Sequence, residues 1–311
     1  MALPDYDQYD AVGLATLVRS GELTAREVLE EAIARAEAVN PALNFLAHRA
    51  YDVARAAADD VHLPRGALMG VPWLVKELAS MWGGQPFTNT SPHCVSLSVS
   101  DSAALLDVTA GALPGEPYGL PRPTRPFRDE VGANTGRLRI ALVTDTPDHG
   151  TPLDGEIKQA VEEAGRLMAS LGHGVEPQPV PYDFWPLYKT YSAIIAVQTA
   201  AFFDGMAGLV GRAATCEDMA PLYWSMIARG RRYSGPDHCN QVEAMRASCR
   251  SLLTRMAAFD LWLVPMLPRV HGYYDMHLDV DTYDDTRMGP DCCYTAPFNA
   301  SGAPAMSVLM G

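Results

Sequence analysis

A single lysine, Lys76, ends an apolar run that contains a proline, in the segment GVPWLVKE from Gly70 to Glu77. A lysine in this position can be buried, and burial lowers the pKa of its side chain because it disfavours the charged ammonium form. A neutral lysine can then accept a proton from a reacting group as a general base. The alternative is a strand end from which the lysine side chain extends into water. Lys76 is therefore the first candidate catalytic residue.

Histidines and carboxylates also gather near residue 275, where His271, Asp275, His277 and Asp279 lie within one short segment. Two imidazoles with carboxylates can bind a divalent metal. However, the segment is acidic and rich in turn-forming residues, and it has neither a histidine pair at helical spacing nor a metallohydrolase motif. These features favour a solvated loop, and we expect neither a metal nor a cofactor.

Cysteine and serine offer two other kinds of nucleophile. The pairs His93-Cys94 and His238-Cys239 suggest a Cys-His nucleophile, but adjacent residues of a strand point to opposite faces and rarely form that hydrogen bond. The six cysteines show no CxxC spacing, which favours buried, inert thiols over a disulfide framework or a zinc site. Four serines alternate at positions 96, 98, 100 and 102. No glycines flank them to form an oxyanion site, so we expect helix capping, with Ser100 as the cap.

Helical signals fill the first 60 residues. A helix is expected from Asp10 to about Gly21, and Thr24 with Glu27 forms a capping box for a second helix that Asn40-Pro41 should end. An alanine-rich helix is expected over 47–59, an apolar strand over 68–75, and a helix from Ser100 to Gly111.

The second half of the chain predicts a parallel α/β arrangement. Strand, helix and strand are expected over 137–144, 154–171 and 174–180, which is the order of a parallel crossover unit. Further helices are expected over 184–205, 217–229 and 237–258, followed by a strand over 259–265.

Composition limits the classes of partner. The chain has 24 basic and 37 acidic residues, a net charge of −13, which argues against nucleic acid and anionic membrane surfaces as partners. Its longest apolar run, Ala193 to Phe203, is too short to span a bilayer, and MALPDYDQYD has no signal-peptide pattern. We therefore expect a cytoplasmic protein; a homo-oligomer stays open. Motifs for nucleotide binding and the GxSxG elbow of other serine hydrolases are absent.

Four stretches together resemble one family of enzymes: residues 9–58, GVPWLVKEL, SLSVSDSAALLDVTAG (96–111) and YTAPFNASGAPAMSVLMG (294–311). In this order they are similar to the amidase signature family, in particular to its bacterial amidases and cyclic-oligoamide hydrolases. The resemblance implies an α/β fold with a mixed sheet flanked by helices. It also implies hydrolysis of carboxylic amide bonds by a Ser, cis-Ser, Lys triad, with Lys76 as the base and a small-molecule amide as the substrate.

Part of the family pattern is missing. The Gly/Ser-rich block that supplies both serines and the oxyanion donors should lie between Lys76 and the SLSVSDSAALLD helix, but only the stretch from Glu77 to Ser96 separates them. We therefore expect one incomplete amidase-like domain over 1–311, with a helical lead-in over 1–60, an internal deletion near 84–95 and a truncation after 311. Lys76 would then be a remnant of the triad.

The substrate side of the site is less informative. By the resemblance, Tyr182 to Tyr191 and Asp291 to Tyr294 would line a pocket for an aliphatic or aryl amide, whereas ordinary core packing explains the same aromatic residues. Residues that bind the substrate stay unknown. The sequence favours an amidase-family protein that is defective in catalysis. The alternative is a non-catalytic binding or interaction protein on the same scaffold.

Overall fold

The computed structural model describes residues 5–43, 45–46, 48–63, 65–74, 96–111, 115, 123–147, 150–219, 221–270 and 289–308. The chain divides into two compact units, unit 1 from Met1 to Asn134 and unit 2 from Thr135 to Gly311. Each unit is described by itself. The single domain expected from the sequence stays a prediction.

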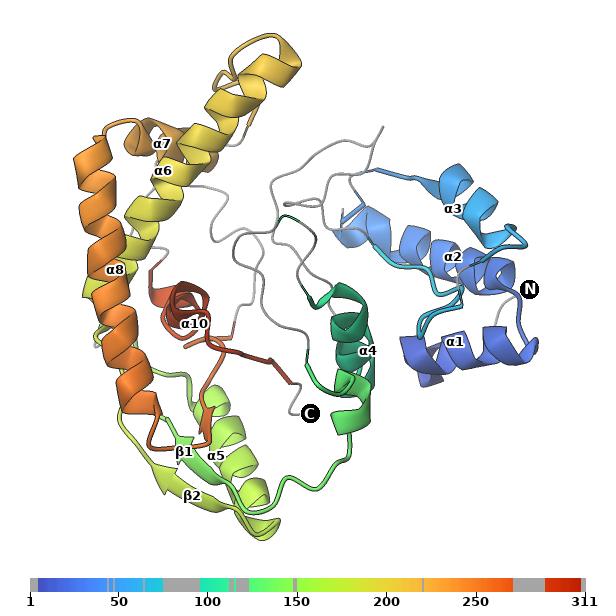
Figure 1. The fold of residues 1–311 in the computed structure, drawn as a ribbon, viewed down its shortest axis with the longest axis horizontal. Helices are drawn as coiled ribbons and strands as arrows, with labels where there is room; N and C mark the ends of the chain where they lie inside the picture. Colours follow the sequence, from blue (N-terminus) through green and yellow to red (C-terminus); the bar gives the residue numbers. More distant parts are fainter. Residues whose placement is uncertain are drawn as a thin grey trace. The chain divides into compact units, whose positions relative to one another are not determined.

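Helices account for the regular structure within the described part of unit 1 (Figure 1). They are the short 3-10 helices η1 (Tyr6–Gln8) and η2 (Phe127–Glu130) and the α-helices α1 (Ala11–Ser20), α2 (Ala25–Leu43), α3 (Tyr51–Ala58) and α4 (Val99–Thr109). The first four predicted helices are thereby confirmed. Three boundaries differ from the prediction: α2 continues past Pro41 to Leu43, α3 begins at Tyr51 and not at residue 47, and α4 begins at Val99 and not at Ser100.

Local sequence signals explain where these helices begin and end. Asp10 accepts a hydrogen bond from the Gly13 N–H at the start of α1, and Gly21 ends the helix in the left-handed conformation (φ 79°). Thr24 and Glu27 form the predicted capping box, since each accepts a hydrogen bond from the backbone N–H of the other.

Unit 1 has a small core where α1 and α2 meet. Leu14 and Val18 of α1 pack with Ala25 and Val28 of α2, and Met69 and Val71 cover them. Ion pairs join α2 to α3, with Arg55 2.9 Å from Glu30 and Arg26 2.6 Å from Asp59. Arg55 and Arg26 lower the pKa of the Glu30 carboxyl to about 2, chiefly through the hydrogen bond from Arg55.

A three-stranded parallel sheet organises unit 2. Its strands β1 (Arg139–Leu142), β2 (Gly174–Pro177) and β3 (Leu261–Leu263) lie in the order β2-β1-β3, with Ile140 opposite both Val175 and Leu261. Helix α5 (Gly155–Ser170) connects β1 to β2, so the predicted parallel crossover is confirmed. Ile140 and Ala141 of the central strand are buried, as expected for a strand paired on both sides.

Three long helices follow the crossover: α6 (Phe184–Val210), α7 (Pro221–Gly230) and α8 (Gly235–Met256). Helix α6 packs against both α7 and α8. Figure 1 shows α6 in yellow and α8 in orange. Ser234 and Asp237 form a capping box at the start of α8. The short helices η4 (Pro290–Cys292) and α10 (Ala296–Ser301) come last, and α10 packs on α6 and α8.

Helix α6 is longer than the apolar run identified in the sequence. By length and composition alone it could cross a membrane, because its apolar stretch extends beyond Ala193 to Phe203 in both directions. The same test is passed by core helices of soluble proteins. The beginning of α6 packs into the core of unit 2, since Phe184, Leu187 and Tyr188 are buried, whereas 22% of the apolar window as a whole is buried.

Candidate functional site

Lys76, the predicted catalytic base, lies outside the described residues, which stop at Leu74 and resume at Ser96. The residues that lead to it are held on the core of unit 1. Gly70 has φ +73°, and a Cβ there would lie 2.9 Å from both Val18 Cγ1 and Ala25 Cβ, so this position requires glycine. The chain that leads to Lys76 is thus held against α1 and α2 at Gly70.

The apolar strand predicted over 68–75 is wrong for residues 68–74. Leu68 to Gly70 form a turn, and none of the described strands pairs with Val71 to Leu74. A strand needs a neighbour for its backbone hydrogen bonds, which sequence patterning alone does not supply. Trp73 and Leu74 are 65% and 61% exposed. Their apolar character therefore does not reflect burial within the described part of the chain.

On the other side of the gap, the serines cap α4, as the sequence favoured, but the cap is Ser98 and not Ser100. The Ser98 hydroxyl oxygen accepts a hydrogen bond from the Asp101 N–H (3.1 Å). The Ser96 and Ser102 hydroxyls are 2.6 Å apart and hydrogen-bonded to each other. Ser98 and Asp101 form an S-x-x-D pattern. The capping signal was therefore in the sequence, two residues before the predicted position.

The starts of α1 and α4 are tied together at what we call the α1–α4 junction, formed by Asp10, Ser98 and Asp101 with the first residues of α1. Ser98 donates a hydrogen bond to Asp10 (2.5 Å), the cap of α1. In return, the buried Asp101 carboxylate accepts hydrogen bonds from the backbone N–H groups of Ala11 (3.0 Å) and Val12 (2.9 Å). Each carboxylate also offsets the partial positive charge of a helix N-terminus. The junction fixes Ser98, close to where the described chain resumes, against α1.

In unit 2, the structure brings together the two segments that the resemblance assigns to a substrate pocket. Tyr182, Phe184 and Tyr188 pack with Cys293 and Tyr294 in one buried cluster. The Tyr182 hydroxyl donates to the Cys293 carbonyl oxygen (2.7 Å), and burial raises its pKa above the usual tyrosine range. These side chains form core. Trp185 and Tyr191 at the margin of the cluster are only partly buried.

An ion pair that the sequence analysis did not identify holds the second of these segments. Arg269 Nη2 lies 2.7 Å from the Asp291 carboxylate, whose side chain is 8% exposed. The pair connects the chain just after β3 to η4, and so helps to fix Cys292 and Cys293 beside the aromatic cluster. No motif signals it, because its two members are far apart in sequence and of common types.

The other candidate nucleophiles and ligands separate into two groups. His271, Asp275, His277, Asp279, His93 and Cys94 lie outside the described residues. Within the residues that the structure describes, no cluster of three or more His, Cys, Asp or Glu side chains could hold a metal ion. His238 and Cys239 lie on α8, and no hydrogen bond joins them in this described helix.

The expectation of buried cysteines is only partly correct. Cys249 and Cys293 are buried, whereas Cys216 and Cys239 are exposed. Burial raises the pKa of the Cys292 thiol, which makes this cysteine a poor nucleophile at neutral pH.

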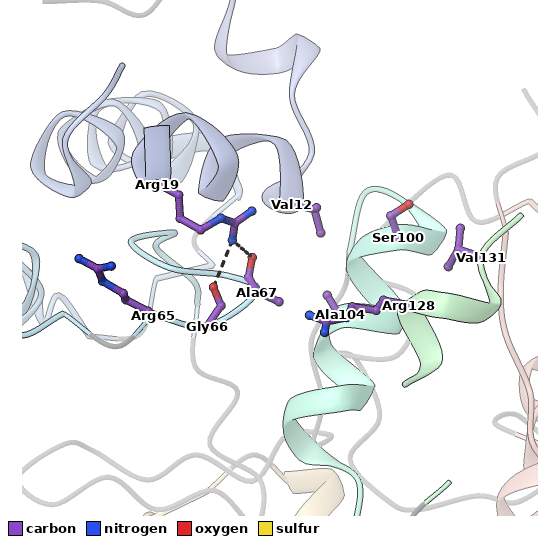
Figure 2. Close-up of a pocket in the computed structure, with 9 residues that line it drawn as sticks. All are labelled: Val12, Arg19, Arg65, Gly66, Ala67, Ser100, Ala104, Arg128 and Val131. Carbon is purple, nitrogen blue, oxygen red and sulfur yellow. Dashed lines mark hydrogen bonds between the residues drawn. The ribbon is translucent and has the colours of Figure 1, made fainter. Parts of the chain in front are cut away.

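Unit 1 also carries a cavity of about 560 Å³ that the sequence analysis missed (Figure 2). Arg19, Arg65 and Arg128 line it, together with apolar side chains and Ser100 of α4. Figure 2 shows Arg19 extending from α1 to the 66–67 backbone, and Arg128 extending beside Ala104. Because the three arginines come from separate parts of the chain, no sequence motif reveals the cavity.

Comparison with known proteins connects these features to a family. The Amidase family model matches residues 91–311. The chain is 30% identical over 224 residues to the 6-aminohexanoate-cyclic-dimer hydrolase of Paenarthrobacter ureafaciens, a match covering 69% of this chain and 45% of that protein. It is 29% identical over 228 residues to the 6-aminohexanoate-cyclic-dimer hydrolase of Pseudomonas sp. strain NK87, with the same coverage. The chain therefore spans about half the length of the curated relatives it matches.

Solved structures show the same fold. A 6-aminohexanoate cyclic dimer hydrolase structure superimposes with a TM-score of 0.84 at 22% identity, covering 94% of this chain and 88% of that one. A bacterial aryl acylamidase of the amidase signature family gives a TM-score of 0.77 at 18% identity, with the same coverage. At these identities the likeness concerns the fold alone, and it confirms the predicted α/β amidase-signature architecture. Since the family model also matches most of its length, the chain belongs to the Amidase family.

Proposed function

We propose that this chain keeps the scaffold of an amide-bond hydrolase but lacks the groups that carry out the hydrolysis. The observation that carries the proposal is the short stretch between Lys76 and Ser96. It contains Ser80, Ser91 and the Gly83-Gly84 pair, yet neither serine adjoins a glycine. By the family resemblance, this is where the Gly/Ser-rich block with both triad serines would stand.

The chemistry explains why this block matters. A serine hydroxyl is a weak nucleophile at neutral pH, so a base must accept its proton as it attacks the amide carbonyl. The oxyanion that forms then needs backbone N–H donors, and losing one such donor raises the barrier by about 3 kcal/mol. Without nucleophile, relay serine and donors, Lys76 has no hydroxyl to deprotonate. We therefore regard Lys76 as a remnant of the triad.

The family supports the class of substrate, and composition supports the setting. The matched relatives are named as hydrolases of a cyclic amide dimer, so a small-molecule amide is the ligand class that this scaffold would take. The net charge of −13 supports a protein that binds neither nucleic acid nor anionic membranes. We place this protein in the cytoplasm. The ligand class, the excluded partners and the location are thus proposed together with the loss of catalysis.

The test is intact-mass analysis of the purified chain after exposure to a fluorophosphonate probe, which labels activated serines. We expect no adduct, under conditions where an active serine hydrolase is fully labelled. The variant Lys76→Ala is measured in parallel, and a thermal melt of each sample establishes that the protein is folded. A single adduct that forms on the chain but not on Lys76→Ala would overturn the proposal, because it would reveal a serine activated by Lys76.

The thermal melt also separates the two forms that a chain without catalysis can take. A cooperative melt without an adduct supports a folded, non-catalytic member of the family, which is the binding or interaction protein named as the alternative. An aggregated protein without an adduct supports a damaged hydrolase.

A further inference from the structure

The cavity of unit 1 combines positive charge with an apolar wall. Arg19, Arg65 and Arg128 line it, and Val12, Ala104 and Val131 contribute apolar surface. Among its described lining residues none is acidic. Arg128 lies 3.7 Å from the Asp129 carboxylate, a longer contact than those of Arg26 and Arg55 in the same unit, which lie 2.6 Å and 2.9 Å from carboxylates. In a chain with 37 acidic and 24 basic residues, such a local excess of positive charge is unexpected.

The guanidinium of Arg19 is held in place with donors to spare. Its Nη1 donates hydrogen bonds to the carbonyl oxygens of Gly66 (3.2 Å) and Ala67 (3.0 Å), and its Nη2 donates to Thr16 Oγ1 (2.9 Å). A guanidinium has five N–H donors, so two remain after these three bonds to described residues. A fixed guanidinium loses little conformational freedom when it binds an anion.

Arg128 has an anchored backbone and an available head group. The Arg128 N–H donates to the Asp107 carboxylate (3.2 Å), which fastens η2 to α4. In the side chain, in contrast, Nε lies 3.7 Å from Oδ1 of Asp129, which is too long for a hydrogen bond. Arg65 lies at the outer margin of the cavity in Figure 2, so we assign the central role to Arg19 and Arg128.

We propose that this cavity binds a small organic anion, whose oxyanion group pairs with Arg19 and Arg128 and whose aliphatic part lies against Val12, Ala104 and Val131. Guanidinium groups bind carboxylates and phosphates through charge-assisted hydrogen bonds. The volume of about 560 Å³ falls in the range of small-molecule sites and exceeds the size of an inorganic ion. This site is separate from Lys76 and does not depend on whether the chain hydrolyses amides.

Isothermal titration calorimetry on the full chain tests the site with three probes that share one aliphatic chain: pentanoate, pentyl phosphate and the uncharged pentan-1-ol. We expect one of the two anions to bind with a stoichiometry of one, and pentan-1-ol not to bind. The anion that binds identifies a carboxylate or a phosphate ester as the ligand class. Failure of both anions to bind, or equal binding of pentan-1-ol, would overturn the proposal.

Variants of Arg128 locate the binding. Arg128→Gln should lower the affinity for the anion about tenfold or more, as expected for the loss of a charge-assisted hydrogen bond. Arg128→Lys should recover part of this affinity. The matched control is Arg166→Gln on α5, because Arg166 is similarly exposed (65% against 59% for Arg128) and has a similar 3.7 Å contact with Glu163. Thermal melts establish that each variant is folded. Equal affinities of folded Arg128→Gln and Arg166→Gln would place the anion elsewhere and overturn the proposal.

Discussion

At the scale of single residues, Asp101 has the widest structural role in unit 1. Its carboxylate lies on α4 but accepts hydrogen bonds from two backbone N–H groups at the start of α1, about 90 positions earlier in the chain. Its own N–H is bonded to Ser98, which in turn donates to Asp10. Only 2% of Asp101 is exposed. Removing its carboxylate would therefore leave two N–H groups without their acceptor.

We predict that Asp101→Ala lowers the free energy of unfolding by about 2–4 kcal/mol, because it removes two charge-assisted hydrogen bonds and leaves their donors unsatisfied. Urea denaturation followed by circular dichroism measures the change. Asp52→Ala is the matched control, since the Asp52 side chain is fully exposed. This substitution removes a 3.5 Å contact with Arg55. Its effect should stay within about 0.5 kcal/mol. Similar effects of the two substitutions would contradict the role given to the α1–α4 junction.

Sequence reasoning could identify part of this junction. Asp10 was predicted as the start of the first helix, and the serine repeat predicted a cap for α4, although at Ser100 and not at Ser98. The bond from α1 to Asp101 could not be predicted, because it joins residues far apart in sequence and follows no local pattern. The arginines of the unit 1 cavity escaped detection for the same reason.

At the scale of elements, the contact between α6 and α7 depends on one glycine. A Cβ at Gly230 would lie 2.0 Å from the Ala196 carbonyl oxygen and 3.0 Å from the Val197 nitrogen. These are backbone atoms inside α6, which cannot move away as a flexible side chain could. The end of α7 therefore approaches α6 as closely as it does only because residue 230 has no side chain.

Gly230→Ala should destabilise unit 2 by about 1–3 kcal/mol or more, the usual cost of overpacking a close contact. The measurement is the thermal unfolding of the variant beside Gly235→Ala, at the start of α8, where a Cβ meets nothing within 4 Å. The control should melt close to the unchanged chain. Equal melting temperatures of the two variants would mean that α6 and α7 are not this close in solution.

Most elements of unit 2 could be predicted because their signals are local. The apolar run of β1, the strand-helix-strand order and the capping box of α8 each lie within a short window. The strand predicted over 68–75 failed because a strand depends on a partner from elsewhere in the chain. Likewise, α6 continues past the predicted end at Gly205 to Val210, because a single glycine inside a helix can be tolerated.

At the scale of the whole molecule, the residues that the structure describes include two hydrophobic clusters, one in each unit. Leu14 and Val28 belong to the cluster of unit 1, whereas Leu252 and Tyr294 belong to the cluster of unit 2. All three strands of the sheet, moreover, lie in unit 2. Each core is formed by residues of one unit, so we predict that each unit loses its protection from solvent independently of the other.

Hydrogen exchange of a matched pair of core variants tests this independence. Leu14→Ala should raise exchange in α1 and α2 while sparing β1, and Leu252→Ala should raise exchange in α6 and α8 while sparing α1. Each substitution removes a buried leucine and should cost about 2–5 kcal/mol within its own unit. Equal loss of protection in both units from either variant would instead support the single domain expected from the sequence.

The anchoring of the chain on either side of Lys76 has a consequence for the chain between the two anchors. Gly70 is fixed against Val18 of α1, and Ser98 is bonded to Asp10 at the start of the same helix. The two ends of the intervening segment are thus held in place by α1, whatever the length of chain between them. Loop-closure entropy rises only with the logarithm of length, by about 0.6 kcal/mol for each doubling. We therefore expect a change in the length of a flexible connection between these two anchors to cost unit 1 little stability.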